Sequence, residues 1–222
     1  MKLKTLLMGA VASTALAPMA FAEAHEGERG RDGEVKIIYW QAPSILNPYL
    51  SSGTKDVEAS SLVLEPLGRY DQNGALVPYL ANEIPTLENG GVSEDLKTIT
   101  WKLKDGLMWS DGTPVTANDV KFTADYCMNP EGGCAQLAKF EGVSSVDVVD
   151  DQTVKVTFSE PMPNPYGPFM GGQSPIIQAA QFADCTGAKA PECTEANFNP
   201  IGTGPFTVTE FRPHDVITMA AN

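Results

Sequence analysis

Few side chains in this sequence have the types and spacing that catalysis requires. The chain contains only two histidines, His25 and His214, and neither pairs with a plausible nucleophile. No G-x-S-x-G or H-E-x-x-H motif occurs. Acidic pairs such as Asp150-Asp151 fall in turns, where solvated carboxylates are the ordinary case. We therefore predict no enzyme activity, no catalytic residue, no metal and no cofactor; a secreted hydrolase that uses two carboxylates is the weaker alternative.

The N-terminal segment has the pattern of an export signal. Lys2 and Lys4 form a basic start, residues 5–18 are mostly small or apolar, and Ala20-Phe21-Ala22 is an A-x-A-like cleavage site. The run is short for a membrane-spanning helix and has no stop-transfer flank. We expect a cleaved signal peptide over 1–22, a flexible mature N-terminus over 23–34, and a periplasmic location.

The charge balance limits the kinds of partner. The chain has 28 acidic and 15 basic residues, for a formal net charge of −13, and no basic cluster. A surface that follows nucleic-acid phosphates needs grouped lysines and arginines. We therefore predict no nucleic-acid partner, and the acidity itself indicates little more than solubility.

Four cysteines in an exported chain favour disulfides over free thiols. Cys127 and Cys134 enclose one turn-rich loop, and Cys185 and Cys193 enclose another. Three connectivities are possible, and we favour the local pairs Cys127-Cys134 and Cys185-Cys193. Each would stabilise the fold by about 2 to 3 kcal/mol on the chain-entropy model. A zinc site is the competing interpretation, but these spacings are wider than zinc motifs and no histidine is near.

The elements that must position any site are clearest between residues 95 and 128. Residues 98–104 alternate, with Ile99, Trp101 and Leu103 on one face, as a half-buried strand requires. Thr116 and Asp119 have the spacing of a capping-box variant and predict a helix from Ala117. The apolar stripe expected on that helix consists of Ala117, Val120, Ala124 and Cys127.

Other segments mix strands and helices irregularly. Further strands are predicted at 35–40, 142–149, 153–158, 207–211 and 216–219, a helix at 54–64, a hairpin-type turn at 71–74 and an ordered loop at 161–168. In the helix we expect Val57, Ser61 and Leu64 to face inward. Because no regular strand–helix–strand repeat appears, the pattern predicts an α+β fold.

The literal residues add a resemblance. K-L-K-D-G, followed by W-S-D-G-T-P-V-T-A-N-D-V-K-F-T, resembles the signature of the large periplasmic solute-binding proteins of peptide, dipeptide and nickel ABC transporters, the bacterial extracellular solute-binding protein family 5. L-V-P-Y-L-A at 76–81 and P-I-G-T-G-P-F at 200–206 follow the order of that family. The likeness covers nearly all of the chain after Val35.

The resemblance implies the N-terminal lobe of a two-lobe, class II periplasmic-binding-protein-like fold with an inserted smaller subdomain. Transferred to this chain, it implies a main lobe over 35–64, the inserted subdomain over 65–197, and a return to the main lobe over 198–222. Members of the family are about twice as long or more. We therefore expect an N-terminal fragment with an incomplete second lobe.

The resemblance also implies capture of a ligand between lobes, with one wall formed by the loop after the first strand. Trp40 and Tyr49 offer aromatic faces, and Gln41 and Asn47 offer amide partners. The alternative, to which we give equal weight, is that Trp40 or Tyr49 packs in the core between the lobes and does not contact the ligand. Gln173 and Ser174, after Gly171-Gly172, form a second candidate wall.

The expected function is therefore binding. The resemblance implies a receptor that captures a peptide and delivers it to an inner-membrane ABC permease with its ATPase subunits. A nickel chelate, haem or an oligosaccharide is the alternative ligand within the same fold. A purely structural envelope domain would neither bind nor turn over a substrate.

Overall fold

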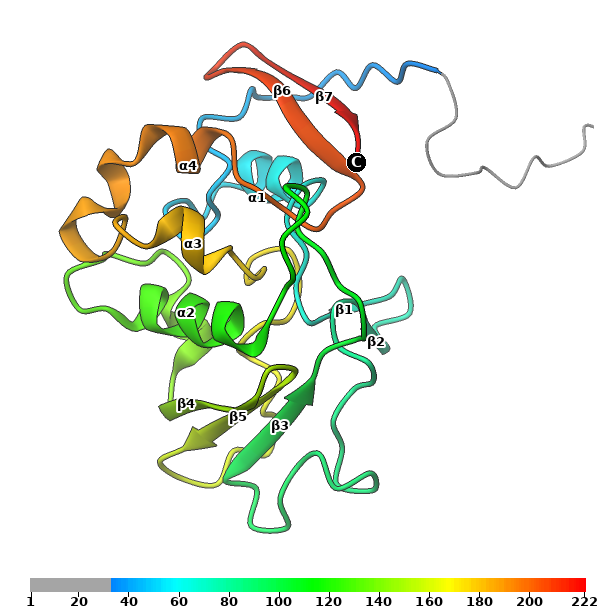
Figure 1. Cartoon of the computed structure of the whole chain (residues 1–222), viewed down its shortest axis with the longest axis vertical. Helices are drawn as coiled ribbons and strands as arrows, with labels where there is room; N and C mark the ends of the chain where they lie inside the picture. Colours follow the sequence, from blue (N-terminus) through cyan, green and yellow to red (C-terminus); the bar gives the residue numbers. More distant parts are fainter. Residues whose placement is uncertain (1–32) are drawn as a thin grey trace, which may run out of the picture. The chain divides into compact units, whose positions relative to one another are not determined.

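The computed structural model describes residues 33–222 (Figure 1). The predicted signal peptide over 1–22, and all but the last two residues of the predicted flexible segment over 23–34, lie outside the described residues. The α-helices are α1 Thr54–Ser60, α2 Ala117–Met128, α3 Ala179–Phe182 and α4 Thr194–Phe198, and the 3-10 helices are η1 Leu137–Phe140 and η2 Gly187–Glu192. The strands are β1 Gly68–Tyr70, β2 Leu76–Pro78, β3 Thr98–Lys102, β4 Val143–Asp150, β5 Thr153–Phe158, β6 Phe206–Arg212 and β7 Val216–Ala221.

The core is built on a three-stranded antiparallel sheet in the order β3-β5-β4. Ile99 pairs with Val156 and Trp101 with Val154, and all four side chains are fully buried. Helix α2 packs against β4 and β5 (Figure 1). Apolar side chains on one face of the sheet thus meet the apolar stripe of one helix, as an α+β core requires.

The periodic elements are confirmed. Ile99, Trp101 and Leu103 are at most 1% exposed, and Val154, Val156 and Phe158 face the same core. The predicted stripe of α2 is completely buried and consists of Ala117, Val120, Ala124 and Cys127. Helix α2 begins at Ala117 as predicted, and the hairpins β1-β2, β4-β5 and β6-β7 form around the expected turns.

Two local predictions are wrong. Residues 35–40 are extended but form no strand, because no other described segment pairs with them; Ile38 is 98% and Trp40 72% exposed. The helix predicted over 54–64 ends at Ser60, and its buried residues are Asp56 and Ser60. Of the residues expected to face inward, Leu64 is fully buried, whereas Val57 and Ser61 are only partly buried. Asp56 faces inward in their place because it accepts hydrogen bonds from Ser44 and Ser51.

The hairpin β6-β7 closes the described chain as a two-stranded ribbon. Asn222 at its end donates from its backbone N–H to the carbonyl oxygen of Pro205, at 2.9 Å. Across residues 33–222, no helix has the length and apolar character needed to cross a membrane.

Candidate ligand-binding site

The loop after the extended segment, residues 41–50, is held in place by one buried carboxylate. Asp56 in the first turn of α1 is 1% exposed. Its oxygens accept hydrogen bonds from the Ser44 N–H at 2.7 Å, the Ser51 hydroxyl at 2.7 Å and the Lys55 ammonium at 2.8 Å. A buried charge is tolerated where it is paired and hydrogen-bonded in this way. Helix α1 therefore anchors both ends of the loop.

The electrostatics of Asp56 reflect two opposing effects. Burial of the carboxyl tends to raise its pKa, since it penalises the charged form. Hydrogen bonds from Lys55, Ser44 and Ser51, together with the charge of Lys55, outweigh burial, so that the pKa lies below its ordinary value. The group is thus ionised at neutral pH and maintains the ion pair.

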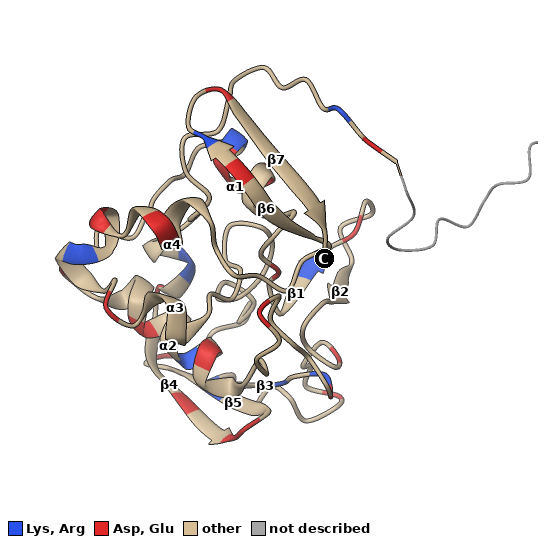
Figure 2. Ribbon diagram, turned by 45° about the horizontal axis from the view of Figure 1, so that its top comes forward, with Lys and Arg blue, Asp and Glu red and all other residues tan. Residues whose placement is uncertain are grey.

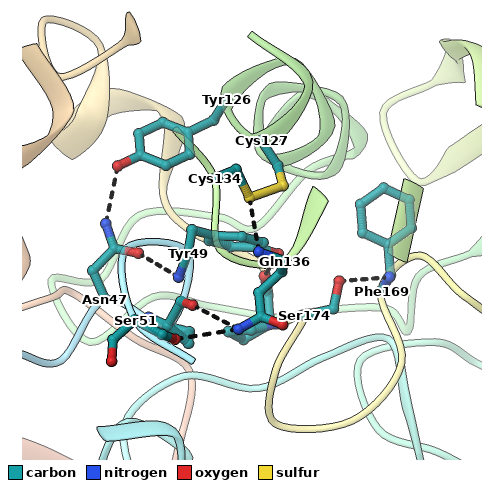
Figure 3. The surroundings of a disulfide bond; sticks show 11 residues. Asn47, Tyr49, Ser51, Tyr126, Cys127, Cys134, Gln136, Phe169 and Ser174 are labelled. Atoms are coloured by element: carbon teal, nitrogen blue, oxygen red, sulfur yellow. Dashed lines mark hydrogen bonds between the residues drawn. A yellow bond between two sulfur atoms is a disulfide. The ribbon is translucent and has the colours of Figure 1, made fainter. Parts of the chain in front are cut away.

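Asn47 and Tyr49 point into the protein (Figure 3). The Asn47 amide donates to the Tyr126 hydroxyl at 3.0 Å and to the Asn197 side-chain oxygen at 2.9 Å, and its own oxygen accepts from the Tyr49 N–H at 3.0 Å. The Tyr49 hydroxyl donates to the Pro175 carbonyl oxygen at 2.6 Å. Burial raises the pKa of Tyr49 far above its ordinary value, so this phenol stays a neutral donor.

The second candidate wall contains one buried residue and one exposed residue. Ser174 is fully buried, and its hydroxyl accepts from the Phe169 N–H at 3.0 Å, whereas Gln173 is exposed. Gly172 packs on α1, and a Cβ at this position would collide with the Ser61 hydroxyl. The close approach that this glycine permits is therefore to the end of helix α1.

The six predicted ligand residues thus form two groups. Asn47, Tyr49 and Ser174 are 0% exposed and hydrogen-bonded within the chain, so their burial argues against direct ligand contact and makes them supports. Trp40, Gln41 and Gln173 are exposed, and their contact with a ligand stays a prediction. Tyr49 lies in the core of the described chain, and the alternative of a core position between lobes stays open for Trp40.

The P-I-G-T-G-P-F segment joins α1 to the signature region. The Gly204 N–H donates to the Val63 carbonyl oxygen at 2.8 Å, and the Ser110 N–H donates to the Gly202 carbonyl oxygen at 2.9 Å. A Cβ on Gly202 would collide with the carbonyl of Val63, so only glycine fits. These contacts fix the exit of α1 relative to the signature loop.

The signature region is a structural element in this fold. Asp119 is 6% exposed and accepts from the Thr116 N–H at 2.9 Å, the Ala179 N–H at 2.9 Å and the Trp109 indole N–H at 3.4 Å. One carboxylate therefore caps α2 and holds the start of α3. Trp109 is 3% exposed, so its side chain belongs to the core.

Sequence reasoning missed two residues that position the loop, Asp56 and Gln136. Asp56 carried a weak signal as an acid in the first turn of a predicted helix. Gln136 is 5% exposed and donates from Nε2 to the carbonyl oxygens of Pro48 at 3.1 Å and Ser51 at 3.2 Å. These partners lie more than 80 positions away in the sequence, so no local pattern indicated them.

An open recess of about 550 Å³ lies elsewhere, between the signature turn, α3, α4 and β6. It is lined by Ser110, Asp111, Gln181, Glu195, Asn199, Pro200, Ile201, Thr207 and Val208. None of the six predicted ligand residues lines it. Side-chain amides that line the recess form hydrogen bonds within the protein; for example, Gln181 Nε2 donates to the Asn199 carbonyl oxygen at 3.0 Å.

Charged side chains form no metal centre in the described part of the chain. Within residues 33–222, no group of three or more His, Cys, Asp or Glu side chains can hold a metal ion. Figure 2 shows basic residues scattered over the elements and separated by acidic ones. All four cysteines are paired as Cys127–Cys134 and Cys185–Cys193, the pairing that the sequence favoured over zinc.

The described residues combine antiparallel sheets with helices, and solved periplasmic binding proteins share this fold over about four fifths of the chain. Comparison with known proteins specifies the family. The sequence profile of the bacterial extracellular solute-binding proteins, family 5 (middle), matches residues 75–222. The chain belongs to this family, which is a family of solute-binding proteins and not of enzymes.

Individual relatives agree with this assignment. A putative ABC transporter peptide-binding protein of Brucella ovis is 29% identical over 163 residues, which is 71% of this chain and 28% of the relative. The oligopeptide-binding protein AppA of Bacillus subtilis, solved with a nonapeptide, is 25% identical with a TM-score of 0.68, over 82% of this chain and 34% of AppA. NikZ of Campylobacter jejuni, solved with Ni(L-His), is 26% identical with a TM-score of 0.66, over 80% of this chain and 33% of NikZ.

The chain spans only about a third of the length of these relatives. Its similarity covers most of its own residues, so the fold of this part is well defined by the comparison. The predicted boundaries at 64/65 and 197/198 remain predictions.

Proposed function

We propose that this chain is part of the substrate-binding component of an ABC importer. It captures di- or oligopeptides in the periplasm and delivers them to an inner-membrane permease with its ATPase subunits. The observation that carries the proposal is the family match over residues 75–222, supported by a relative described as peptide-binding and by AppA with its nonapeptide.

The local geometry gives this function a mechanism. Trp40 presents an apolar face with a polar indole N–H, and Gln41 and Gln173 present amides that can pair with peptide groups. The buried residues Asn47, Tyr49 and Ser174 fix the backbones that carry these contacts. A ligand that binds a closed form better than an open form selects the closed form, and capture needs no bond to be made or broken.

A nickel chelate is the second candidate ligand, because NikZ was solved with Ni(L-His). The same exposed aromatic and amide groups suit a chelated amino acid as well as a peptide. Haem and oligosaccharide remain alternatives from the resemblance alone.

Export completes the proposal. The export-signal pattern over 1–22 supports a periplasmic location for a mature protein that begins at Glu23. Intact-mass measurement of the protein recovered from the periplasm checks this, since retention of residues 1–22 would contradict it.

The test of function is mass spectrometry of small molecules released from the full-length gene product after purification from the periplasm. Recovered peptides support the proposal, whereas a metal chelate, haem or sugar replaces the ligand and keeps the fold. An empty protein that cleaves a peptide or glycan panel would support the hydrolase and overturn the binding function.

Fluorescence provides a site-specific measurement. Trp40 is 72% exposed, whereas Trp101 and Trp109 are 0% and 3% exposed, so quenching by iodide reports mainly on Trp40 in this part of the chain. Binding of the recovered ligand should shield Trp40, and a Trp40→Ala variant should bind at least about tenfold more weakly, or ~1.4 kcal/mol. A Tyr70→Ala variant is the control, because Tyr70 is 53% exposed and outside both predicted walls.

A further inference from the structure

Two loops, each closed by a disulfide, hold the same short stretch of backbone. The first disulfide loop runs from Cys127 to Cys134, with Cα atoms 5.1 Å apart, and the second from Cys185 to Cys193, with Cα atoms 5.8 Å apart. The stretch between them, Leu46–Ser51, contains no helix or strand and is called here the anchored turn. Because it has no internal ladder of hydrogen bonds, its order depends on external partners.

The first disulfide loop holds the anchored turn through the residues that follow Cys134 (Figure 3). The Ala135 N–H donates to the Tyr49 carbonyl oxygen at 2.8 Å, and Gln136 Nε2 donates to the carbonyl oxygens of Pro48 and Ser51 at 3.1 and 3.2 Å. The Gln136 N–H in turn donates to the sulfur of Cys134 at 3.4 Å. The bond to Cys127 at the end of α2 thus fixes the point from which these donors project.

The second disulfide loop holds the other end of the turn through Asn197. The Leu46 N–H donates to the Asn197 carbonyl oxygen at 2.9 Å, and the Asn47 amide donates to the Asn197 side-chain oxygen at 2.9 Å. Asn197 is itself attached to the loop, since its amide donates to the Ala190 carbonyl oxygen at 2.8 Å and its N–H to the Cys193 carbonyl oxygen at 2.9 Å.

We infer that the two disulfides form a clamp that positions the anchored turn, with Gln136 and Asn197 as the positioning residues. Closing a short loop lowers the number of conformations available to the residues beside it, so each bridge keeps its donors or acceptors aimed at the turn. The two contact sets differ: Ala135 and Gln136, beside the first disulfide, contact Pro48, Tyr49 and Ser51, whereas Asn197, beside the second, contacts Leu46 and Asn47. Asn47 is the one residue with contacts on both sides, since its amide also donates to Tyr126, next to Cys127. The link to ligand affinity rests on the proposed function, because the loop that begins at Gln41 runs directly into this turn.

The test is site-resolved amide hydrogen exchange in the full-length gene product. Replacing the first bridge by Cys127→Ser with Cys134→Ser should speed exchange at Leu50 and Ala135 by about tenfold or more, a loss of ~1.4 kcal/mol. Replacing the second by Cys185→Ser with Cys193→Ser should do the same at Leu46 and Asn197. Each disulfide variant is the matched control for the other, because each should speed exchange at a different pair of amides. The exchange rates of the β5 amides are the internal reference in both variants.

A second pair of variants keeps both disulfides. Gln136→Ala should speed exchange at Leu50 and Ala135, as the first bridge variant does. Gln152→Ala should not, because the Gln152 side-chain amide donates to the carboxylate of Asp105, which lies outside the anchored turn. Gln136→Glu should behave like the alanine variant at pH 8.

Binding of trialanine, measured by calorimetry, is the second readout. If wild type binds it, we expect either bridge variant to bind about tenfold more weakly. If wild type binds neither trialanine nor any peptide recovered with it by mass spectrometry, the proposed function fails, but exchange still decides the clamp. Unchanged exchange in the anchored turn, or equal acceleration at the turn and in β5, would overturn the inference.

Discussion

At the scale of single residues, Asp56 has the largest effect on the candidate loop. We expect Asp56→Ala to lower the free energy of unfolding by about 3 to 5 kcal/mol, because it leaves the 11%-exposed Lys55 ammonium and the Ser44 N–H without their partner. Urea unfolding measures this change. Glu58→Ala is the control, since Glu58 is exposed on the same helix and should change stability by less than about 0.5 kcal/mol.

The pH dependence of the same carboxyl has a definite sign. Its pKa in the folded protein lies below the ordinary value of 3.8, so its contribution to stability is present above about pH 4 and is lost as the pH falls through the folded pKa. The stability difference between wild type and Asp56→Asn should therefore be constant from pH 7 to pH 5 and shrink below pH 4. A difference that grows with acid would contradict the proposed ion pair.

At the scale of elements, Asp119 connects the start of α2 to the start of α3. Asp119→Ala removes the acceptor of four donors: the N–H groups of Thr116 and Ala179, the Thr116 hydroxyl and the indole of Trp109. We expect a loss of about 2 to 4 kcal/mol, since a cap and a buried acceptor are lost together. Urea unfolding followed by circular dichroism tests it.

The matched control lies on the same helix. Asp125 pairs with Lys121 at 2.6 Å, but both side chains are about half exposed. Asp125→Ala should therefore cost no more than about 0.5 kcal/mol. Equal losses in the two variants would mean that the cap of α2 adds nothing beyond surface charge.

The helices and strands also differ in how well the sequence predicted them. The strand with Ile99, Trp101 and Leu103 and the stripe of α2 were predictable, because a local period reports which face is buried. Residues 35–40 had the same alternation and failed as a strand, since a strand also needs a partner, which alternation cannot supply. The roles of Asp56 and Gln136, and the burial of Asn47 and Tyr49, depend on residues distant in the sequence, so only the fold shows them.

At the scale of the whole molecule, three distant segments meet at Gly202. The exit of α1 passes against it at Val63, the signature loop bonds to its carbonyl through Ser110, and β6 follows two residues after Gly204. Movement of a single side chain cannot make room for a methyl group at Gly202, because the group would collide with the backbone of Val63. Relief requires all three segments to move.

We therefore expect Gly202→Ala to destabilise the chain by about 2 kcal/mol or more, within the range that overpacking costs. Thermal unfolding followed by circular dichroism and by tryptophan emission should show one shared, lowered midpoint, since the junction belongs to the common core. Gly132→Ala is the control, because its nearest contact would be 3.3 Å and its loop lies at the surface end of α2. If only the emission transition moved, Gly202 would serve the signature loop alone, and the junction would not couple α1 to the β6-β7 ribbon.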